Sequence, residues 1–360
     1  MAIDRITLTR FRNHDASRLD GSGKLNLLVG ENGAGKTNVL EAISLLAPGR
    51  GLRRAPLADM AEGGSGGFTV TAELDCGDGR EPVRLGTGTR EERPSRRLVQ
   101  INGAETSAMA LGEWLAIAWL TPAMDRLFAD SAGARRRYMD RLALALDPSH
   151  ARHSARYEAA LRERNRLLAA DDDPDARWFE SLEVQLAEAG AALAQGRAGL
   201  VERLAAALAR LPDGPFARPT LAYVSGGPVE AEALAAELAR HRMRDRAAQR
   251  TLSGPHRDEL EVTLYGTGMP AGHCSTGEQK AMLIAMTLAH AELASAGRPG
   301  VLLLDEVAAH LDPVRRATLF ERLRDGGAQA WLTGTELAPF ETIAGEAAVW
   351  RVSDGTVARG

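Results

Sequence analysis

Cysteine and aromatic residues are scarce in this sequence, and each shortage excludes a class of protein. The chain has 2 cysteines in 360 residues, Cys76 and Cys274, far apart in the sequence. That excludes a disulfide framework, and no Cys/His spacing indicates a zinc site. Aromatic residues make up 4% of the chain, which disfavours a protein that binds single strands by stacking on their bases.

Long hydrophobic runs are also missing. The most apolar stretch, residues 281–289, is about half of the ~18 residues that a membrane span needs. The first five residues include an acid and a base and do not form a secretory signal. We therefore expect a cytoplasmic protein of a reducing compartment, with no membrane partner.

An excess of positive charge is absent as well. Lys plus Arg total 44 against 48 for Asp plus Glu, which gives a net charge of −4. A protein that coats nucleic acid through bulk charge is thereby excluded, and any DNA contact must come from a local basic surface. The hydrophobic fraction of 44% is ordinary for a folded protein, and 360 residues predict two lobes.

The two ends of the chain differ in pattern from its middle. Both ends contain short apolar runs split by glycine, whereas the middle is rich in Ala, Leu, Arg and Glu at helical spacing. We predict an α/β head made from residues 1–134 and 256–360, with an all-helical lobe without a long coiled coil at residues 135–255. Strands are expected at residues 3–8, 25–29, 301–304 and 328–332, and a hairpin turn at 102–103. Helices are expected at 36–46 and 229–250, and two to four more within 135–211, with a loop at 171–174.

A glycine-rich loop stands between the second apolar run and the first helix, and it matches GxxxxGK[ST]. Such a loop turns several backbone N–H groups toward one phosphate group, and the helix N-terminus adds partial positive charge. Lys36 supplies a charge to the β- and γ-phosphates, and the Thr37 hydroxyl can bind Mg²⁺. The strand–loop–helix context argues against a chance glycine-rich turn. The loop residues are Gly30, Glu31, Asn32, Gly33, Ala34, Gly35, Lys36 and Thr37.

Two acids follow a second strongly apolar run. Residues 301–304 are Val-Leu-Leu-Leu, typical of a strand buried on both faces of a parallel sheet. Asp305 then lies at the carboxyl end of that strand, where open α/β sheets bind ligands, and can hold Mg²⁺. Glu306 can orient and deprotonate an attacking water. Taken alone these are as easily two solvated acids, but beside a phosphate loop they predict hydrolysis.

A third motif precedes the acidic strand. Ser275 and Glu278 have the spacing of a capping box at the start of an apolar helix. By itself the motif favours only a well-capped buried helix. Its residues are Ser275, Thr276, Gly277, Glu278, Gln279 and Lys280, and the loop after the acidic strand contains His310, Leu311 and Asp312.

The order of these motifs resembles the ABC-type ATPase head. The resemblance implies that the signature, residues 275–280, closes over the nucleotide held by the phosphate loop of a second subunit. The sequence itself leaves open whether Ser275 acts within the chain or across a dimer. Further blocks resemble the RecF family of bacterial recombination and gap-repair ATPases. They are Phe11-Arg12-Asn13, residues 119–125, residues 134–140, Gly254-Pro255-His256-Arg257-Asp258 and Thr333-Gly334-Thr335.

The RecF resemblance implies a function. It implies ATP and Mg²⁺ as ligands, a homodimer that closes on DNA when ATP binds, and slow, DNA-stimulated ATP hydrolysis. It further implies a role in replication and the SOS response to DNA damage, in which recombinase is loaded at gaps and stalled forks with RecR and RecO as partners. Lys36, Asp305 and Glu306 are then the catalytic residues.

Two other functions remain open at this point. A transporter motor is disfavoured because residues 333–335 lack the usual histidine, which also leaves the γ-phosphate sensor unassigned. A nucleotide-gated DNA scaffold that does not hydrolyse ATP is the third interpretation.

Basic residues occur in four runs, at residues 50–54, 93–97, 135–137 and 240–246, and each such run is more often a solvated face. Duplex phosphates need only a modest local cluster when two protomers combine their charge. Arg12 has two candidate ligands, a nucleotide phosphate or DNA. The candidate contacts to duplex, gapped or junction DNA are Arg53, Arg54, Arg136 and Arg242.

Overall fold

The computed structural model divides into two compact units. The first consists of Met1–Asp125, Asp213–Phe216 and Leu283–Gly360, and the second of Arg126–Pro212 and Ala217–Met282. The structure describes residues 2–64, 66–75, 81–170, 175–212, 214–295 and 297–360, so Cys76 and the loop expected at 171–174 lie outside the described residues.

The boundaries differ from those expected from the sequence. Residues 126–134 and 256–282 belong to the second unit, although the sequence pattern places them with the head. The difference arises because residues 259–264 form a strand that pairs with a partner inside the predicted helical lobe. As a result, the signature at residues 275–280 belongs to the second unit.

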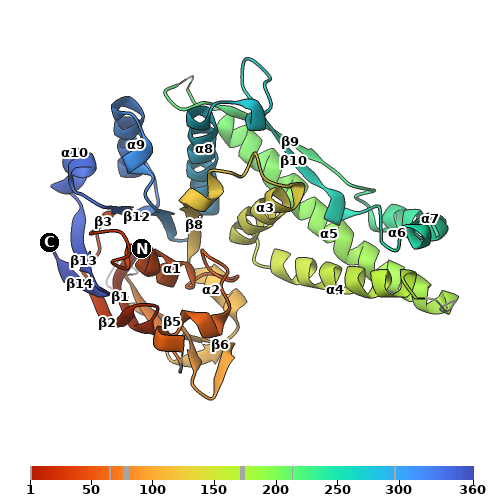
Figure 1. Cartoon of the computed structure of the whole chain (residues 1–360), viewed down its shortest axis with the longest axis horizontal. Helices are drawn as coiled ribbons and strands as arrows, with labels where there is room; N and C mark the ends of the chain where they lie inside the picture. Colours follow the sequence, from red (N-terminus) through yellow and green to blue (C-terminus); the bar gives the residue numbers. More distant parts are fainter. Residues whose placement is uncertain (1, 65, 76–80, 171–174, 213, 296) are drawn as a thin grey trace. The chain divides into compact units, whose positions relative to one another are not determined.

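A six-stranded sheet carries the candidate site of the first unit. Its order is β14-β13-β3-β12-β11-β8, and all its neighbours are parallel except β13 and β14 (Figure 1). Both ends of the chain supply strands to it, as the α/β pattern predicts. The strands are β3 (Leu25–Val29), β8 (Ala116–Leu120), β11 (Gly300–Leu304), β12 (Gln329–Gly334), β13 (Ala348–Ser353) and β14 (Thr356–Arg359).

The central strands of this sheet are buried on both faces, whereas β14 at its edge is largely exposed. β8 and β11 are buried at every residue, and Trp331 stacks on Trp350 with ring centroids 5.3 Å apart. The helices of the unit include α9, which begins where local signals predict, since Asp312 caps it and Pro313 is its first residue. They are α1 (Lys36–Ser44), α2 (Leu111–Trp114), α9 (Pro313–Asp325), α10 (Glu341–Ala344) and the second part of α8 (Thr276–Ala294).

A second six-stranded sheet in this unit is antiparallel, in the order β2-β1-β4-β5-β6-β7. The predicted hairpin turn at Asn102 and Gly103 joins β6 to β7, and both residues have positive φ, 50° and 83°. The strands are β1 (Ala2–Phe11), β2 (His14–Asp20), β4 (Thr69–Asp75), β5 (Val83–Arg90), β6 (Arg93–Ile101) and β7 (Ala104–Thr106).

The second unit is largely helical, but the prediction of an all-helical lobe is wrong in one place. Residues 219–224 form β9, which pairs antiparallel with β10. β9 begins with alternating buried and exposed residues, the period of a half-buried strand. The elements are α3 (Ala132–Leu146), α4 (His150–Leu168), α5 (Ala176–Leu208), β9 (Pro219–Val224), α6 (Ala231–Arg240), α7 (Arg242–Ala247) and β10 (Glu259–Leu264).

A buried ion network lies inside the second unit and centres on Arg197 of α5. Its guanidinium donates to both carboxylate oxygens of Asp140 at 2.8 Å and to Asp258 Oδ2 at 2.8 Å. Tyr223 also donates to Asp258 Oδ2, at 2.6 Å. Two separate blocks of the family resemblance, at residues 134–140 and 254–258, therefore meet at one arginine.

No helix among the described residues is long and apolar enough to cross a membrane.

Candidate nucleotide site

The phosphate loop follows β3 and leads into α1, as the sequence predicts. Two of its glycines are required by space. A Cβ at Gly30 would lie 2.0 Å from the Val352 carbonyl oxygen, and one at Gly35, whose φ is +114°, would lie 2.7 Å from His14 Nε2. At these two positions the loop packs so closely against the Val352 backbone and the His14 side chain that a Cβ atom would collide with them.

The amine of Lys36 lies against the loop backbone. Nζ donates to the carbonyl oxygens of Gly30 and Glu31, both at 2.7 Å. Burial lowers the pKa of Lys36, while the nearby carboxylates of Glu306 and Asp305 act to raise it. A cation held here in a low-dielectric setting is well placed to attract phosphate oxygens.

Two turns far apart in the sequence hold the loop in place. His14 Nε2 lies 3.1 Å from the Gly35 carbonyl oxygen, and Asn13 Nδ2 donates to the Ala34 carbonyl at 3.2 Å. Gly355, between β13 and β14, donates its N–H to that same Ala34 carbonyl at 3.0 Å. The sequence pattern singled out Asn13 within a motif, but nothing local to residues 14 or 355 indicates this contact.

The two predicted Mg²⁺ ligands lie together. Thr37 Oγ1 donates to Asp305 Oδ1 at 2.9 Å, although 268 residues separate them. Asp305 follows β11 at its carboxyl end, where the buried strand delivers it to the loop. A hydroxyl and a carboxylate are hard oxygen donors, which suit Mg²⁺. The residues present thus fit the ion that the sequence predicts.

Thr333 joins the two acids, and sequence reasoning gave it no role. Its hydroxyl donates to Asp305 Oδ1 at 2.8 Å and accepts the backbone N–H of Glu306 at 2.9 Å. Glu306 has a φ of +53°, a conformation that costs a non-glycine residue about 1–3 kcal/mol and persists only where surrounding contacts offset that cost. Thr333 is 1% exposed, so its two hydrogen bonds fix the backbone that carries the predicted general base.

The capping box of the signature is confirmed. Ser275 N–H donates to Glu278 Oε2 at 2.8 Å, and Glu278 N–H donates to Ser275 Oγ at 3.3 Å. Gln279 is tied to the Cys274 carbonyl at 2.8 Å. These contacts present the start of α8 as a rigid helix N-terminus with polar side chains on it. The nucleotide role of residues 275–280 stays a prediction.

The loop between β11 and α9 is also held locally. Asp312 Oδ1 accepts the Arg315 N–H at 3.0 Å, and this backbone hydrogen bond is the main cause that lowers the pKa of Asp312. Leu311 is buried, whereas the side chain of His310 lies outside what the structure describes.

Arg12 is held by protein groups in the structure. Nε and Nη2 donate to the two carboxylate oxygens of Glu41 at 2.9 and 2.8 Å, and Nη1 donates to the Asp59 carbonyl at 2.8 Å. Because Glu41 is fully buried on α1, this bidentate pair couples the turn after β1 to the helix that follows the phosphate loop. A contact from Arg12 to a nucleotide phosphate stays a prediction.

Three of the four candidate DNA contacts already bind groups within the protein. Arg242 donates from Nε to Oε1 and from Nη2 to Oε2 of buried Glu183, at 3.0 and 2.6 Å, and Arg136 donates to the Asp258 carbonyl at 2.8 Å. Arg53 bridges Asn38 and Glu41 at 2.6 and 2.8 Å although it is exposed, and Arg54 is exposed as well. Most of the guanidinium groups predicted to contact DNA therefore already have hydrogen-bond partners inside the protein.

Comparisons with known proteins agree with the geometry. Residues 2–346 match the family model described as RecF/RecN/SMC N terminal domain. The chain is 50% identical over 371 residues to the DNA replication and repair protein RecF of Mesorhizobium japonicum, covering 99% of this chain and 97% of that protein. It is 46% identical over 372 residues to the protein of that name from Brucella suis, covering 99% and 95%.

One solved structure shares the fold at lower identity. It is the structure of the recombination mediator protein RecF-ATP in the RecFOR pathway. It matches with a TM-score of 0.86 and 23% identity, and the match covers 100% of this chain and 97% of that one.

Proposed function

Because the chain belongs to the RecF family, we propose that it is an ATP-dependent DNA-binding protein of replication and recombinational repair. The observation that carries the proposal is the convergence of Lys36, Thr37 and the acids after β11 at one phosphate loop. The names of its relatives support the biological role, and the RecFOR pathway of the structural relative supports RecR and RecO as partners.

The residues of the site divide the work of binding and hydrolysis. Backbone N–H groups of residues 30–37 and the charge of Lys36 bind the phosphates. Thr37 and Asp305 would hold Mg²⁺, which when bound neutralises charge that develops on the phosphates. Glu306 orients the attacking water and takes its proton. The signature of a second copy of the chain completes the site.

The chemistry is coupled to DNA by dimerisation. Two chains close head to tail over two nucleotides, and closure brings two basic surfaces together around duplex DNA. Hydrolysis at Glu306 removes the γ-phosphate that joins the chains, so the dimer reopens. DNA binding is therefore expected to require ATP and to fall with salt.

Lys36→Ala tests this proposal. The variant is expected to lose ATP binding, because it removes the buried cation and both of its bonds to the loop, and with it the ATP-dependent part of DNA affinity. Anisotropy of a fluorescent ATP analogue measures nucleotide binding, and anisotropy of labelled duplex, with and without ATP, measures the DNA affinity. Lys24→Ala is the matched control, since among the described residues the Lys24 amine donates only to the Gly326 carbonyl, far from the phosphate loop in sequence. DNA binding that is equal with and without ATP in the wild type would instead favour a passive scaffold.

Thr333→Val is a subtler test of the same site. Valine keeps the shape but leaves the Glu306 N–H and Asp305 Oδ1 each without one partner. If the two lost hydrogen bonds raise the activation free energy by about 1–2 kcal/mol, kcat is expected to fall about tenfold while KM stays nearly unchanged. Thr333→Ser restores the hydroxyl and is expected to restore kcat. Steady-state ATPase kinetics decide it, and equal rates for the valine and serine variants would contradict the positioning role.

A further inference from the structure

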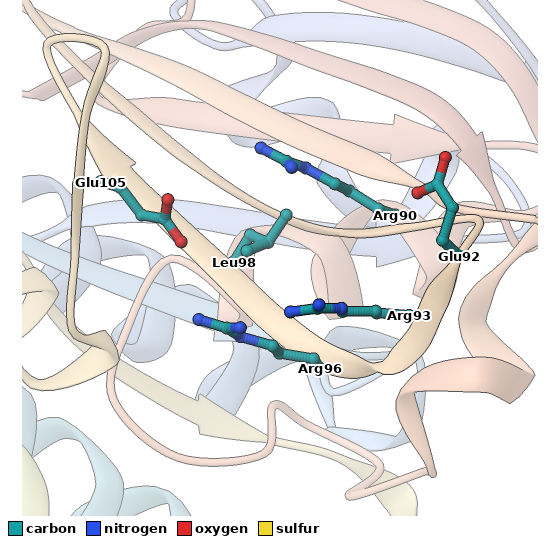
Figure 2. Close-up of a pocket in the computed structure, with 6 residues that line it drawn as sticks. All are labelled: Arg90, Glu92, Arg93, Arg96, Leu98 and Glu105. Carbon is teal, nitrogen blue, oxygen red and sulfur yellow. The ribbon is translucent and has the colours of Figure 1, made fainter.

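Three arginines line a hollow on the antiparallel sheet of the first unit, away from the phosphate loop in sequence. Two of them belong to the basic run at residues 93–97, but none is among the four candidate DNA contacts singled out from the sequence. The hollow has a volume of about 370 Å³. Figure 2 shows the three arginine side chains running in the same direction past Leu98. Its lining residues are Arg90, Glu92, Arg93, Arg96, Leu98 and Glu105.

The side chains of these three arginines form no hydrogen bond or ion pair among the described residues, whereas several other arginines of the same sheet do. Arg90 and Arg93 are directly opposite across the β5–β6 pair, an arrangement in which like charges destabilise a hairpin. Glu92 and Glu105 line the same hollow but form no ion pair with any of the three. Elsewhere on this sheet Arg5 and Arg84 both bind Glu73, at 2.6 and 2.7 Å.

Arg97, which follows Arg96 in β6, is by contrast an arginine with a structural role. Arg97 donates to the Gly49 and Ala47 carbonyls at 2.6 and 3.1 Å and to the Thr87 hydroxyl at 2.9 Å. Burial lowers its pKa to about 10. The basic run at residues 93–97 thus separates into one arginine that braces the fold and two, Arg93 and Arg96, that are exposed.

We propose that the hollow formed by Arg90, Arg93 and Arg96 binds phosphate groups of the duplex DNA backbone. The inference rests on the proposed DNA-binding function and names a contact surface for it. Guanidinium groups bind phosphate oxygens in bidentate fashion, and a bound anion relieves the repulsion between Arg90 and Arg93. DNA is favoured over a protein partner because Leu98 is the one apolar residue among those lining the hollow, whereas protein interfaces need apolar anchors at their centre.

The double variant Arg93→Gln/Arg96→Gln tests the inference in the full-length chain. In the presence of ATP, its affinity for duplex DNA is expected to fall about tenfold. The slope of log affinity against log salt is expected to become shallower by about 2, because each phosphate contact that is lost no longer releases counterions from the DNA. The thermal midpoint should not fall, because the replaced arginines have no partners to lose. ATP turnover without DNA should stay at the wild-type value.

The matched control is Arg18→Gln/Arg84→Gln, which removes the same charge from exposed, acid-paired arginines of the same sheet. An equal loss of affinity in both double variants would overturn the inference, since bulk charge would then explain it. So would an unchanged salt slope in the test variant, or a loss of polyglutamate binding with DNA affinity intact, which would indicate an acidic protein segment. If the wild type itself shows no ATP-dependent DNA binding, it is the proposed function that fails.

Discussion

Glu306→Gln is expected to lower the rate of ATP hydrolysis about 10²- to 10⁴-fold, the range that a positioned general base contributes. Glutamine keeps the size of the side chain but cannot accept a proton from water. The Glu306 backbone is held by Thr333 at 2.9 Å, so the substituted side chain starts from the same place. Phosphate release under single-turnover conditions measures the chemical step.

Binding should survive this change. The phosphate loop and Lys36 are untouched, so affinity for ATP is expected to remain within a few-fold of the wild type, and the ATP-bound dimer should persist longer on DNA. Glu336→Gln, an exposed glutamate that follows β12, is the matched control and should hydrolyse ATP normally. A Glu306→Gln chain that turns over ATP at the wild-type rate would show that another group takes the proton.

Arg197→Met is expected to destabilise the second unit by about 3–5 kcal/mol, because removing one partner of a buried ion network leaves the others uncompensated. Methionine fills similar space but leaves Asp140 and Asp258 without their shared cation. Hydrogen exchange of the α5 amides measures the opening free energy of this region by itself. Arg203→Met, at an exposed position of α5, should change it little.

The stability that Arg197→Met removes should also depend on pH. Burial acts to raise the pKa of Asp140, but bonds from His150 and Arg197 outweigh it and hold that pKa below its usual value. A depressed aspartate pKa contributes stability above the unfolded pKa, near 3.9, and loses it as the pH falls through the folded value. The difference in opening free energy between wild type and Arg197→Met is therefore expected to become smaller below about pH 4. A gap independent of pH would argue against an electrostatic origin.

Much of the site could be predicted because its parts are local in sequence. The phosphate loop needs glycines, a lysine and a threonine within residues 30–37, and a run of four apolar residues fixes β11 with Asp305 at its end. Capping at Ser275 and Asp312 follows from residues three apart. In each of these places a short stretch carries the complete physical signal.

The rest depends on contacts that no short stretch carries. Thr333 acts on the acids only because β12 lies beside β11, and Gly355 reaches the phosphate loop only through the pairing of β13 with β3. β9 was missed because its partner, β10, lies 35 residues further on, with helices between them. Likewise, the structure shows which of the candidate DNA-binding arginines already have partners within the protein. The pattern of charges in the sequence does not reveal those partners.

Whether two chains complete each other's nucleotide site is tested most directly by mixing two inactive variants. Lys36→Ala keeps an intact signature, and Ser275→Arg keeps an intact phosphate loop, so a mixed dimer contains one complete site if the signature acts across the dimer. Each variant alone should be nearly inactive, and an equimolar mixture should recover about a quarter of the wild-type ATPase rate, with half the dimers mixed and one site of two intact in each. A mixture no more active than its components would contradict the shared site and place the signature within its own chain.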